Sequence, residues 1–159
     1  MSKRILLVCT GNICRSPLAS ALLSKALQDR DLDGVEVSSA GTGAWDGAPA
    51  SEGAYLVALE RGLDLSSHRA RLLTRELVEG SDLILTMARH HRARVDELGG
   101  DGRVFVLGEF AGRSGSDAEV SDPFGGDLEV YRDTCAELEA LITAVVERLA
   151  REAAGGSPR

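Results

Sequence analysis

Cysteines and long apolar runs are both scarce in this sequence. There are three cysteines, an odd number, and the apolar run near the first residue is too short for the core of an export signal. These features argue against a disulfide framework, and we expect a cytoplasmic protein whose cysteines stay reduced. No stretch approaches the roughly 18 consecutive apolar residues of a membrane-spanning helix, so we expect no membrane association.

Positive charge is also in short supply. The chain has 18 Lys and Arg against 25 Asp and Glu, a formal net charge of −7. Such a chain offers no attractive field to a nucleic-acid backbone, and we expect no nucleic-acid partner. The length of 159 residues and the hydrophobic fraction of 43% fit one globular domain. We place this domain at residues 1–154 and expect the tail at 155–159 to be disordered.

Short apolar segments alternate with helical patterns along the chain. Four segments have the length and boundaries of strands: 5–8, 35–38, 83–85 and 104–107. Helical spacing of apolar residues is found at 18–27, at 54–61 with Gly62 as the closing residue, and at 138–149. The alternation predicts an α/β, single-domain three-layer sandwich around a central four-stranded parallel sheet, with 35–38 at an edge.

The most informative segment joins the first predicted strand to the first predicted helix. It reads Cys9-Thr10-Gly11-Asn12-Ile13-Cys14-Arg15-Ser16-Pro17. Ser16 suits a helix N-cap and Pro17 the first helical position, so free backbone N–H groups should face this loop. Those groups and the positive end of the helix dipole bind anions and stabilise a thiolate. Ligands of parallel α/β sheets bind beyond the carboxyl ends of the strands, where this loop is placed.

Five residues separate Cys9 from Arg15 in this loop. With that spacing the chain can curl until the intervening N–H groups point inward and the Arg15 guanidinium closes the ring. Gly11 permits a tight backbone, and Asn12 tolerates left-handed geometry. A thiol inside an oxyanion cradle predicts phosphoryl transfer through a cysteine; a structural thiol at a strand end is the alternative.

Two segments together resemble a known family. Residues 9–17 resemble the signature loop of the low-molecular-weight protein tyrosine phosphatases, and Asp122-Pro123-Phe124-Gly125-Gly126 resembles their general-acid loop. Residues 39–42, followed by Trp45, and 68–71 resemble further family segments, so the likeness runs from Arg4 to about Leu149. It implies a hydrolase in which Cys9 attacks phosphorus and forms a phosphocysteine. Asp122 would protonate the leaving oxygen and then activate water.

The resemblance also implies roles for the loop residues. Arg15 would bind the phosphate together with the rest of the phosphate-binding loop, Thr10, Gly11, Asn12, Ile13, Cys14 and Ser16. Ser16 would stabilise the Cys9 thiolate, and His68 would hold the Asn12 side chain. Cys14 would form a reversible disulfide with Cys9 that protects the nucleophile from over-oxidation.

The substrate pocket implied by the resemblance has Ile13, Trp45 and Phe124 as walls. Flat apolar walls suit an aryl phosphate and favour phosphotyrosine. The acid loop, with Tyr131 soon after it, is closer to that of the bacterial protein-arginine phosphatases, which carry a threonine where this chain has Ile13. Protein-arginine phosphatase is therefore the alternative, and a non-catalytic phosphate-binding module is a further one.

The remaining cysteines and histidines suggest no second site. An arsenate reductase would need further cysteines, and none stands between Cys14 and Cys135. We expect Cys135 to pack in the last helix and His90 and His91 to be solvated, with no metal site. No cofactor is implied. The expected partners are a phosphorylated protein and phosphate or another oxyanion, bound by a monomer.

Overall fold

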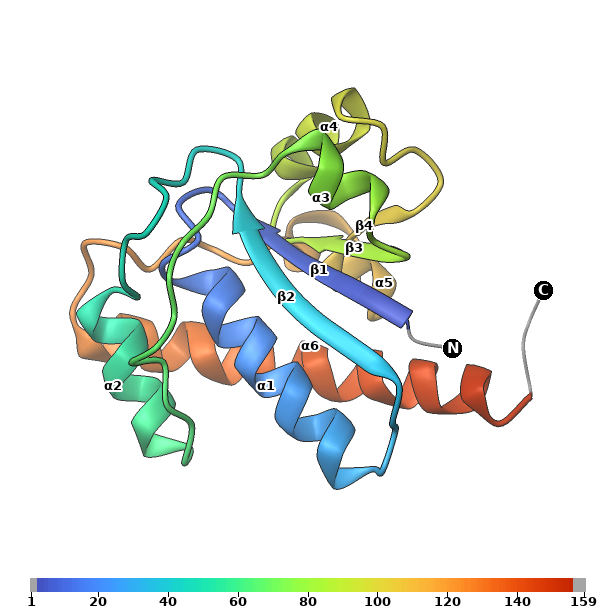
Figure 1. Cartoon of the computed structure of the whole chain (residues 1–159). Helices are drawn as coiled ribbons and strands as arrows, with labels where there is room; N and C mark the ends of the chain where they lie inside the picture. Colours follow the sequence, from blue (N-terminus) through green and yellow to red (C-terminus); the bar gives the residue numbers. More distant parts are fainter. Residues whose placement is uncertain (1–2, 156–159) are drawn as a thin grey trace.

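Four parallel strands form one sheet at the centre of the molecule (Figure 1). The computed structural model describes residues 3–155. The strands are β1 (Lys3–Cys9), β2 (Val35–Gly41), β3 (Leu83–Thr86) and β4 (Val104–Val106), in the order β2-β1-β3-β4. The predicted parallel sheet is confirmed, and β2 lies at its edge, as predicted for residues 35–38. The fourth strand ends one residue early, because Leu107 begins a short helix.

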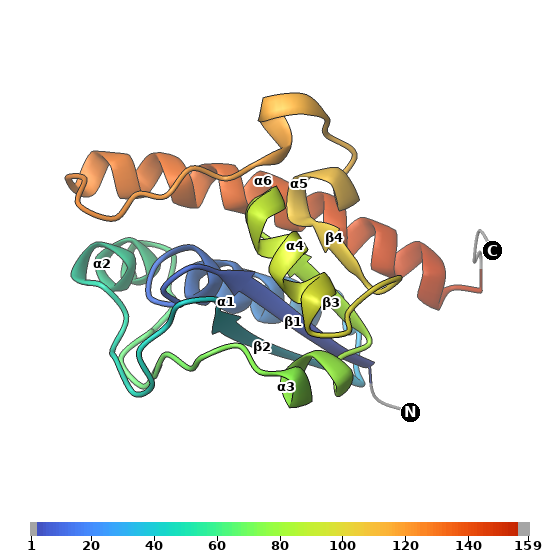
Figure 2. The same ribbon diagram turned by 90° about the horizontal axis from the view of Figure 1, so that it is seen from above.

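Helices lie on both faces of this sheet. They are α1 (Arg15–Asp29), α2 (Glu52–Glu60), α3 (Arg75–Glu79), α4 (Arg89–Glu97), α5 (Leu107–Phe110) and α6 (Leu128–Ala153), with a 3-10 turn at Gly115–Ala118. Figures 1 and 2 show α1 and α6 on one face and α3 and α4 on the other. This arrangement confirms the three-layer sandwich. None of the described helices is long and apolar enough to cross a membrane.

The central strand β1 explains why both faces are covered. Its side chains alternate, and Ile5 and Leu7 pack in the core that α1, α2 and α6 share. Leu6 and Val8 face the opposite core, beneath α3 and α4. Because both sets of side chains are buried, the strand reads as a continuous apolar run rather than an alternating one.

The start of α1 differs from the prediction. The helix begins at Arg15, its N-cap is Cys14 without a side-chain hydrogen bond, and Ser16 lies inside the first turn. Ser16 does not cap the helix because its hydroxyl hydrogen-bonds the side chains of Cys9 and Asn12. The prediction for the end of α2 is confirmed, since Gly62 follows it with a left-handed φ of 74°.

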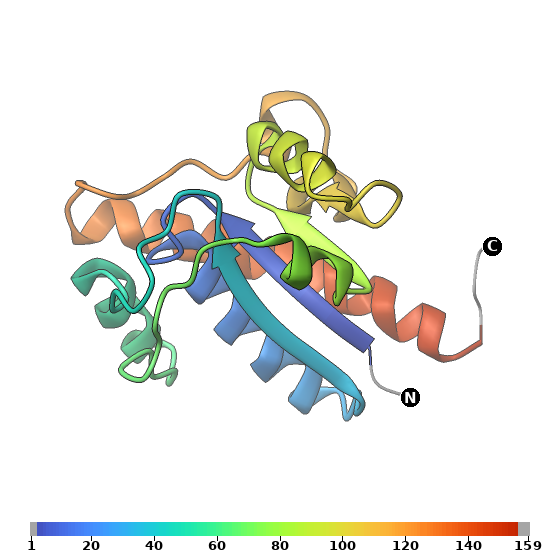
Figure 3. The ribbon, with the colours of Figure 1, turned by 45° about the horizontal axis from the view of Figure 1, so that its top comes forward.

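A long segment connects β4 to α6 and contains α5 and the 3-10 turn. In Figure 3 it runs from α5 past the carboxyl end of β1 to the start of α6. Its first part folds tightly, because a Cβ at Gly108 would overlap the backbone of Ala118. The segment therefore brings residues 119–124 to the loop that follows β1. Of the tail predicted to be disordered, residues 156–159 lie outside the described part of the chain.

Candidate active site

The loop between β1 and α1 has a fixed backbone. Asn12 has a φ of 57°, the left-handed geometry that its residue type tolerates. Its carbonyl oxygen lies 2.7 Å from His68 Nε2, and the carbonyl of Ile13 accepts a hydrogen bond from Ser51 N–H at 2.9 Å. These two hydrogen bonds hold the carbonyl groups on the outside of the loop.

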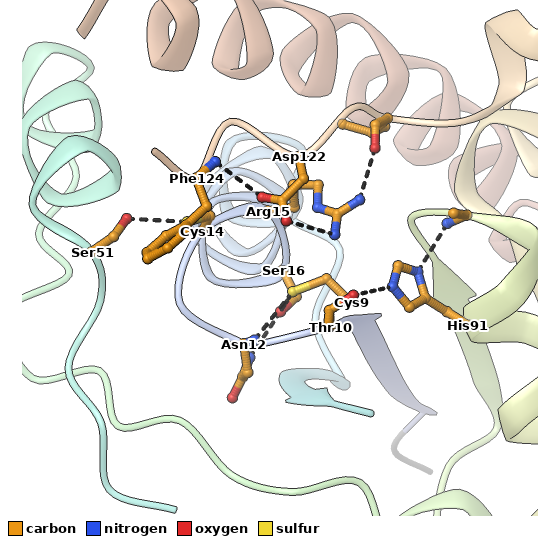
Figure 4. Close-up of polar contacts among 12 residues, drawn as sticks. Cys9, Thr10, Asn12, Cys14, Arg15, Ser16, Ser51, His91, Asp122 and Phe124 are labelled. Atoms are coloured by element: carbon orange, nitrogen blue, oxygen red, sulfur yellow. Dashed lines mark hydrogen bonds and ion pairs between the residues drawn. The ribbon is translucent and has the colours of Figure 1, made fainter. Parts of the chain in front are cut away.

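The Cys9 sulfur lies inside this curl, with two donors near it (Figure 4). Asn12 N–H donates to Sγ at 3.3 Å, and Ser16 Oγ lies 2.9 Å from Sγ. Asn12 Nδ2 in turn donates to Ser16 Oγ at 2.8 Å. Because Ser16 accepts that bond, its own proton can point to the sulfur. The arrangement stabilises a thiolate rather than a neutral thiol.

The Asn12 side chain is held differently from the prediction. Its amide donates to Ser39 Oγ at 2.9 Å as well as to Ser16, and its carbonyl oxygen accepts from Arg71 N–H at 2.9 Å. His68 contacts the Asn12 backbone oxygen, so the expectation that it holds the side chain is wrong. The sequence alone could not distinguish a contact with the Asn12 side chain from a contact with the Asn12 backbone, because in both cases the His68 imidazole lies beside Asn12.

Arg15 is buried beneath the cavity, with 5% of its surface exposed. One terminal nitrogen donates to the Val120 carbonyl at 2.9 Å, and the other lies 3.6 Å from the Asp122 carboxylate. The buried Nε has no hydrogen-bond partner within residues 3–155. A buried guanidinium N–H without an acceptor is costly, and an oxyanion in the cradle would satisfy it.

Asp122 is positioned by the segment that crosses the end of the sheet. Val120 N–H donates to the Met87 carbonyl at 2.9 Å, just beyond β3, and the Val120 carbonyl accepts from Arg15. Asp122 Oδ1 accepts from Phe124 N–H at 3.1 Å, and the side chain of Asp122 is half exposed. A carboxyl group at the cavity mouth can exchange protons with a bound group and with water.

A cavity of about 210 Å³ opens between these elements. It is lined by Cys9, Thr10, Gly11, Ile13, Cys14, Arg15, Asp122 and Phe124. The structure thus brings together the predicted nucleophile, anion-binding arginine and acid, with two of the three predicted pocket walls. Trp45 is not in the lining; its side chain lies 85% exposed in the loop after β2. The cavity floor is polar, and its walls at Ile13 and Phe124 are apolar.

The Cys14 side chain contacts two hydroxyl groups. Its sulfur lies 3.2 Å from Ser51 Oγ and 3.4 Å from the Tyr131 hydroxyl. Burial raises the pKa of the Cys14 thiol, and burial followed by the contact with Cys14 raises the pKa of Tyr131 to about 12. Both cysteines are free thiols here. Sequence analysis missed Ser51, whose only local signal is its position as the N-cap of α2.

His91 contradicts its prediction. It is fully buried rather than solvated, because the first turn of α4 packs against the loop and His91 Nε2 lies 2.8 Å from Thr10 Oγ1. His90 is exposed, as expected. Cys135 lies in the core, as its place in the α6 pattern indicated. Among the described residues no cluster of three or more His, Cys, Asp or Glu could hold a metal ion.

Comparisons with known proteins agree on one family. Residues 4–154 match the family model described as low molecular weight phosphotyrosine protein phosphatase. A protein-arginine-phosphatase of Geobacillus stearothermophilus is 42% identical over 96% of this chain and 99% of its own length. A probable low molecular weight protein-tyrosine-phosphatase of Ralstonia solanacearum is 40% identical over 94% and 97%. The crystal structure of a low molecular weight protein tyrosine phosphatase from T. tengcongensis superposes with a TM-score of 0.85, at 40% identity over 92% and 99%.

Proposed function

Since the chain belongs to the low molecular weight phosphotyrosine protein phosphatase family, we propose that it hydrolyses phosphotyrosine in phosphorylated proteins through a phosphocysteine intermediate. One observation carries the proposal: Cys9, Arg15 and Asp122 line the same 210 Å³ cavity. A site that only bound phosphate would need neither a thiol held by two donors nor a carboxyl group at its mouth.

The first step transfers the phosphoryl group to sulfur. The Cys9 thiolate forms an S–P bond while the bond from phosphorus to the tyrosyl oxygen breaks. Asp122 gives its proton to that oxygen, so the product leaves as a neutral phenol. The Arg15 guanidinium binds the equatorial oxygens together with the loop N–H groups. Its Nε, which has no hydrogen-bond partner within residues 3–155, can donate to one of these oxygens.

The second step releases phosphate. The Asp122 carboxylate takes a proton from a water molecule whose oxygen attacks phosphorus, and the S–P bond breaks to return the Cys9 thiolate. The two donors on the sulfur, Asn12 N–H and the Ser16 hydroxyl, stabilise it as the leaving group. The chemistry is complete with a thiolate, a guanidinium and a carboxyl group.

The walls of the cavity support phosphotyrosine over phosphoarginine. Ile13 and Phe124 offer apolar surface to an aromatic ring, and the Ile13 side chain has no polar atom that could bind a guanidinium. The Trp45 side chain would be a third apolar contact for the substrate if the loop after β2 brings this side chain against the bound peptide. Protein-arginine phosphatase stays the second candidate, because the relative from Geobacillus stearothermophilus with that name is 42% identical.

We further propose that a peroxide converts the Cys9 thiolate to a sulfenic acid and that the Cys14 thiol then displaces water to form a disulfide. Cys14 must first leave its contacts with Ser51 and Tyr131. A dithiol reductant restores both thiols. We place the protein in the cytoplasm as a monomer, where thiols are kept reduced.

Turnover of para-nitrophenyl phosphate tests the activity, and paired peptides test the substrate. Wild-type protein should release para-nitrophenol at mildly acidic pH, Cys9→Ser should be inactive, and Asp122→Ala should be impaired. A phosphotyrosine peptide should give a higher kcat/KM than a phosphoarginine peptide of the same sequence. Ile13→Thr should shift that ratio toward phosphoarginine. An inactive wild type, or an active Cys9→Ser, contradicts the proposed function.

A further inference from the structure

His91 contacts the phosphate-binding loop at Thr10, a residue that lines the cavity. His91 stands in the first turn of α4 and is fully buried. Its Nδ1 lies 3.1 Å from Ala88 N–H, and its Nε2 lies 2.8 Å from Thr10 Oγ1 (Figure 4). Thr10 follows Cys9 in the chain and lines the cavity. One imidazole thus joins the end of β3 to the phosphate-binding loop.

The partners of the ring determine its tautomer. A backbone N–H can only donate, so Nδ1 must accept from Ala88 and carries no proton. The ring proton is therefore on Nε2, which donates to Thr10 Oγ1. A second proton on Nδ1 would face the Ala88 N–H directly. In line with this geometry, burial first, and then the charges of His90 and Arg15, lower the His91 pKa to about 3.

The tautomer in turn determines what the Thr10 hydroxyl can do. Because Oγ1 accepts the hydrogen bond from His91, its own proton must point elsewhere. Thr10 is an exposed residue that lines the cavity together with Cys9 and Arg15, so this proton is free to point into the cavity. An acceptor in this cavity would be an oxygen of the bound anion. Neutral His91 thus makes the Thr10 hydroxyl a donor.

We propose that the Thr10 hydroxyl donates a hydrogen bond to an oxygen of the phosphoryl group in the cradle, and that His91 is the positioning residue that orients it. This inference rests on the proposed phosphatase function. It adds one side-chain donor to a cradle that otherwise consists of backbone N–H groups and Arg15. It also assigns a use to the one buried histidine among the described residues.

Inorganic phosphate is the probe, with its Kd measured by calorimetry and its Ki against para-nitrophenyl phosphate. Thr10→Val keeps the side-chain volume but removes the donor, and should weaken phosphate binding at least about tenfold, because one hydrogen bond to a charged group is lost. Thr10→Ser should restore the affinity. His91→Phe should weaken binding to a similar degree, and His91→Phe combined with Thr10→Val should bind no more weakly than Thr10→Val alone. A merely structural role for His91 predicts additive losses instead.

Three results would overturn the inference: unchanged phosphate affinity in Thr10→Val, additive losses in the double variant, or a ring proton on Nδ1. The third is read from two-bond ¹⁵N–¹H spectra of the wild-type imidazole, so it holds even if His91→Phe does not fold. The phosphate Kd needs no turnover. Failure of this contact is therefore distinguishable from failure of the proposed function, which shows as an inactive wild type.

Discussion

Ser16 Oγ lies 2.9 Å from Cys9 Sγ while it accepts a hydrogen bond from the Asn12 side-chain amide at 2.8 Å. Each partner restricts the next: the amide can only donate, so the hydroxyl proton is free for the sulfur. Ser39 and Arg71 hold the same amide from the outside. A polar chain that begins at the edge strand β2 thus ends at the nucleophile.

Loss of the Ser16 hydroxyl should destabilise the Cys9 thiolate. In Ser16→Ala we expect alkylation of Cys9 by iodoacetamide near pH 6 to slow about tenfold, since one hydrogen bond to a charged group is lost. The breakdown of the phosphoenzyme should slow as well. Ser24→Ala in the same helix, far from the loop, is the matched control. Equal alkylation rates in the two variants would contradict the role given to Ser16.

Gly41 leaves room for the loop at the end of β2. A Cβ there would overlap the Thr10 carbonyl oxygen and lie 2.9 Å from the Asn12 backbone nitrogen. We expect Gly41→Ala to lower the free energy of unfolding by about 1–3 kcal/mol, the usual cost of overpacking, and to abolish most of the activity. Gly43→Ala meets nothing closer than 4.0 Å and should behave as wild type. Urea unfolding measures the stability of the two variants, and turnover measures their activity. Equal results for Gly41→Ala and Gly43→Ala would refute the close approach of Gly41 to the loop.

Acid should destabilise the protein through His91. Burial lowers its pKa from the ordinary 6.5 to about 3, so the unfolded chain binds a proton that the folded protein excludes. Stability from this group is complete above pH 6.5 and falls as the pH drops from 6.5 toward 3. Between about pH 8 and pH 5 the wild type should lose about 2 kcal/mol more than His91→Gln.

Urea titrations at several pH values measure this difference. His90→Gln changes the exposed neighbour in the same helix and should keep the pH dependence of the wild type. If His91→Gln and the wild type lose stability in parallel as the pH falls, His91 is protonated in the folded protein, and the neutral ring is refuted.

The Asp122 carboxyl should matter most where the leaving group is poor. Phenolate needs a proton on departure more than para-nitrophenolate does, so Asp122→Asn should lower kcat/KM for phenyl phosphate at least about tenfold more than for para-nitrophenyl phosphate. Glu119→Gln alters a nearby carboxylate that accepts from Arg89 N–H outside the cavity. It serves as the control. An equal loss on both substrates would show that Asp122 does not act as the acid.

The sequence patterns predicted the sheet, its edge strand and the main helices because these depend on local apolar spacing. Residues 9–17 likewise predicted the cradle, since the nucleophile, arginine and helix start are neighbours in the chain. Contacts between segments that are distant in the chain could not be predicted from the sequence. Tyr131 approaches Cys14 across 117 positions, and His91 approaches Thr10 across 81. No local pattern encodes such a pairing.

The errors have the same physical origin. His91 stands in a polar stretch typical of a solvated helix, yet α4 turns this one position toward the loop. Ser16 has the residue type of an N-cap, but tertiary partners claim its hydroxyl. In both cases a contact with a partner replaces the role that the local sequence favours for a polar side chain. The partner of His91 comes from a distant segment, whereas those of Ser16 come from the same loop.

In the proposed mechanism the phosphoryl group passes through the Cys9 sulfur, and trapping the phosphocysteine is the sharpest test of that step. In Asp122→Ala, para-nitrophenolate still leaves without an acid, whereas water attack loses its base, so the phosphoenzyme should accumulate. After an acid quench, mass spectrometry of the digested protein should find phosphate on the peptide that contains Cys9. If the Asp122→Ala enzyme turns over substrate but carries no phosphate on Cys9 after the quench, the phosphocysteine mechanism is wrong.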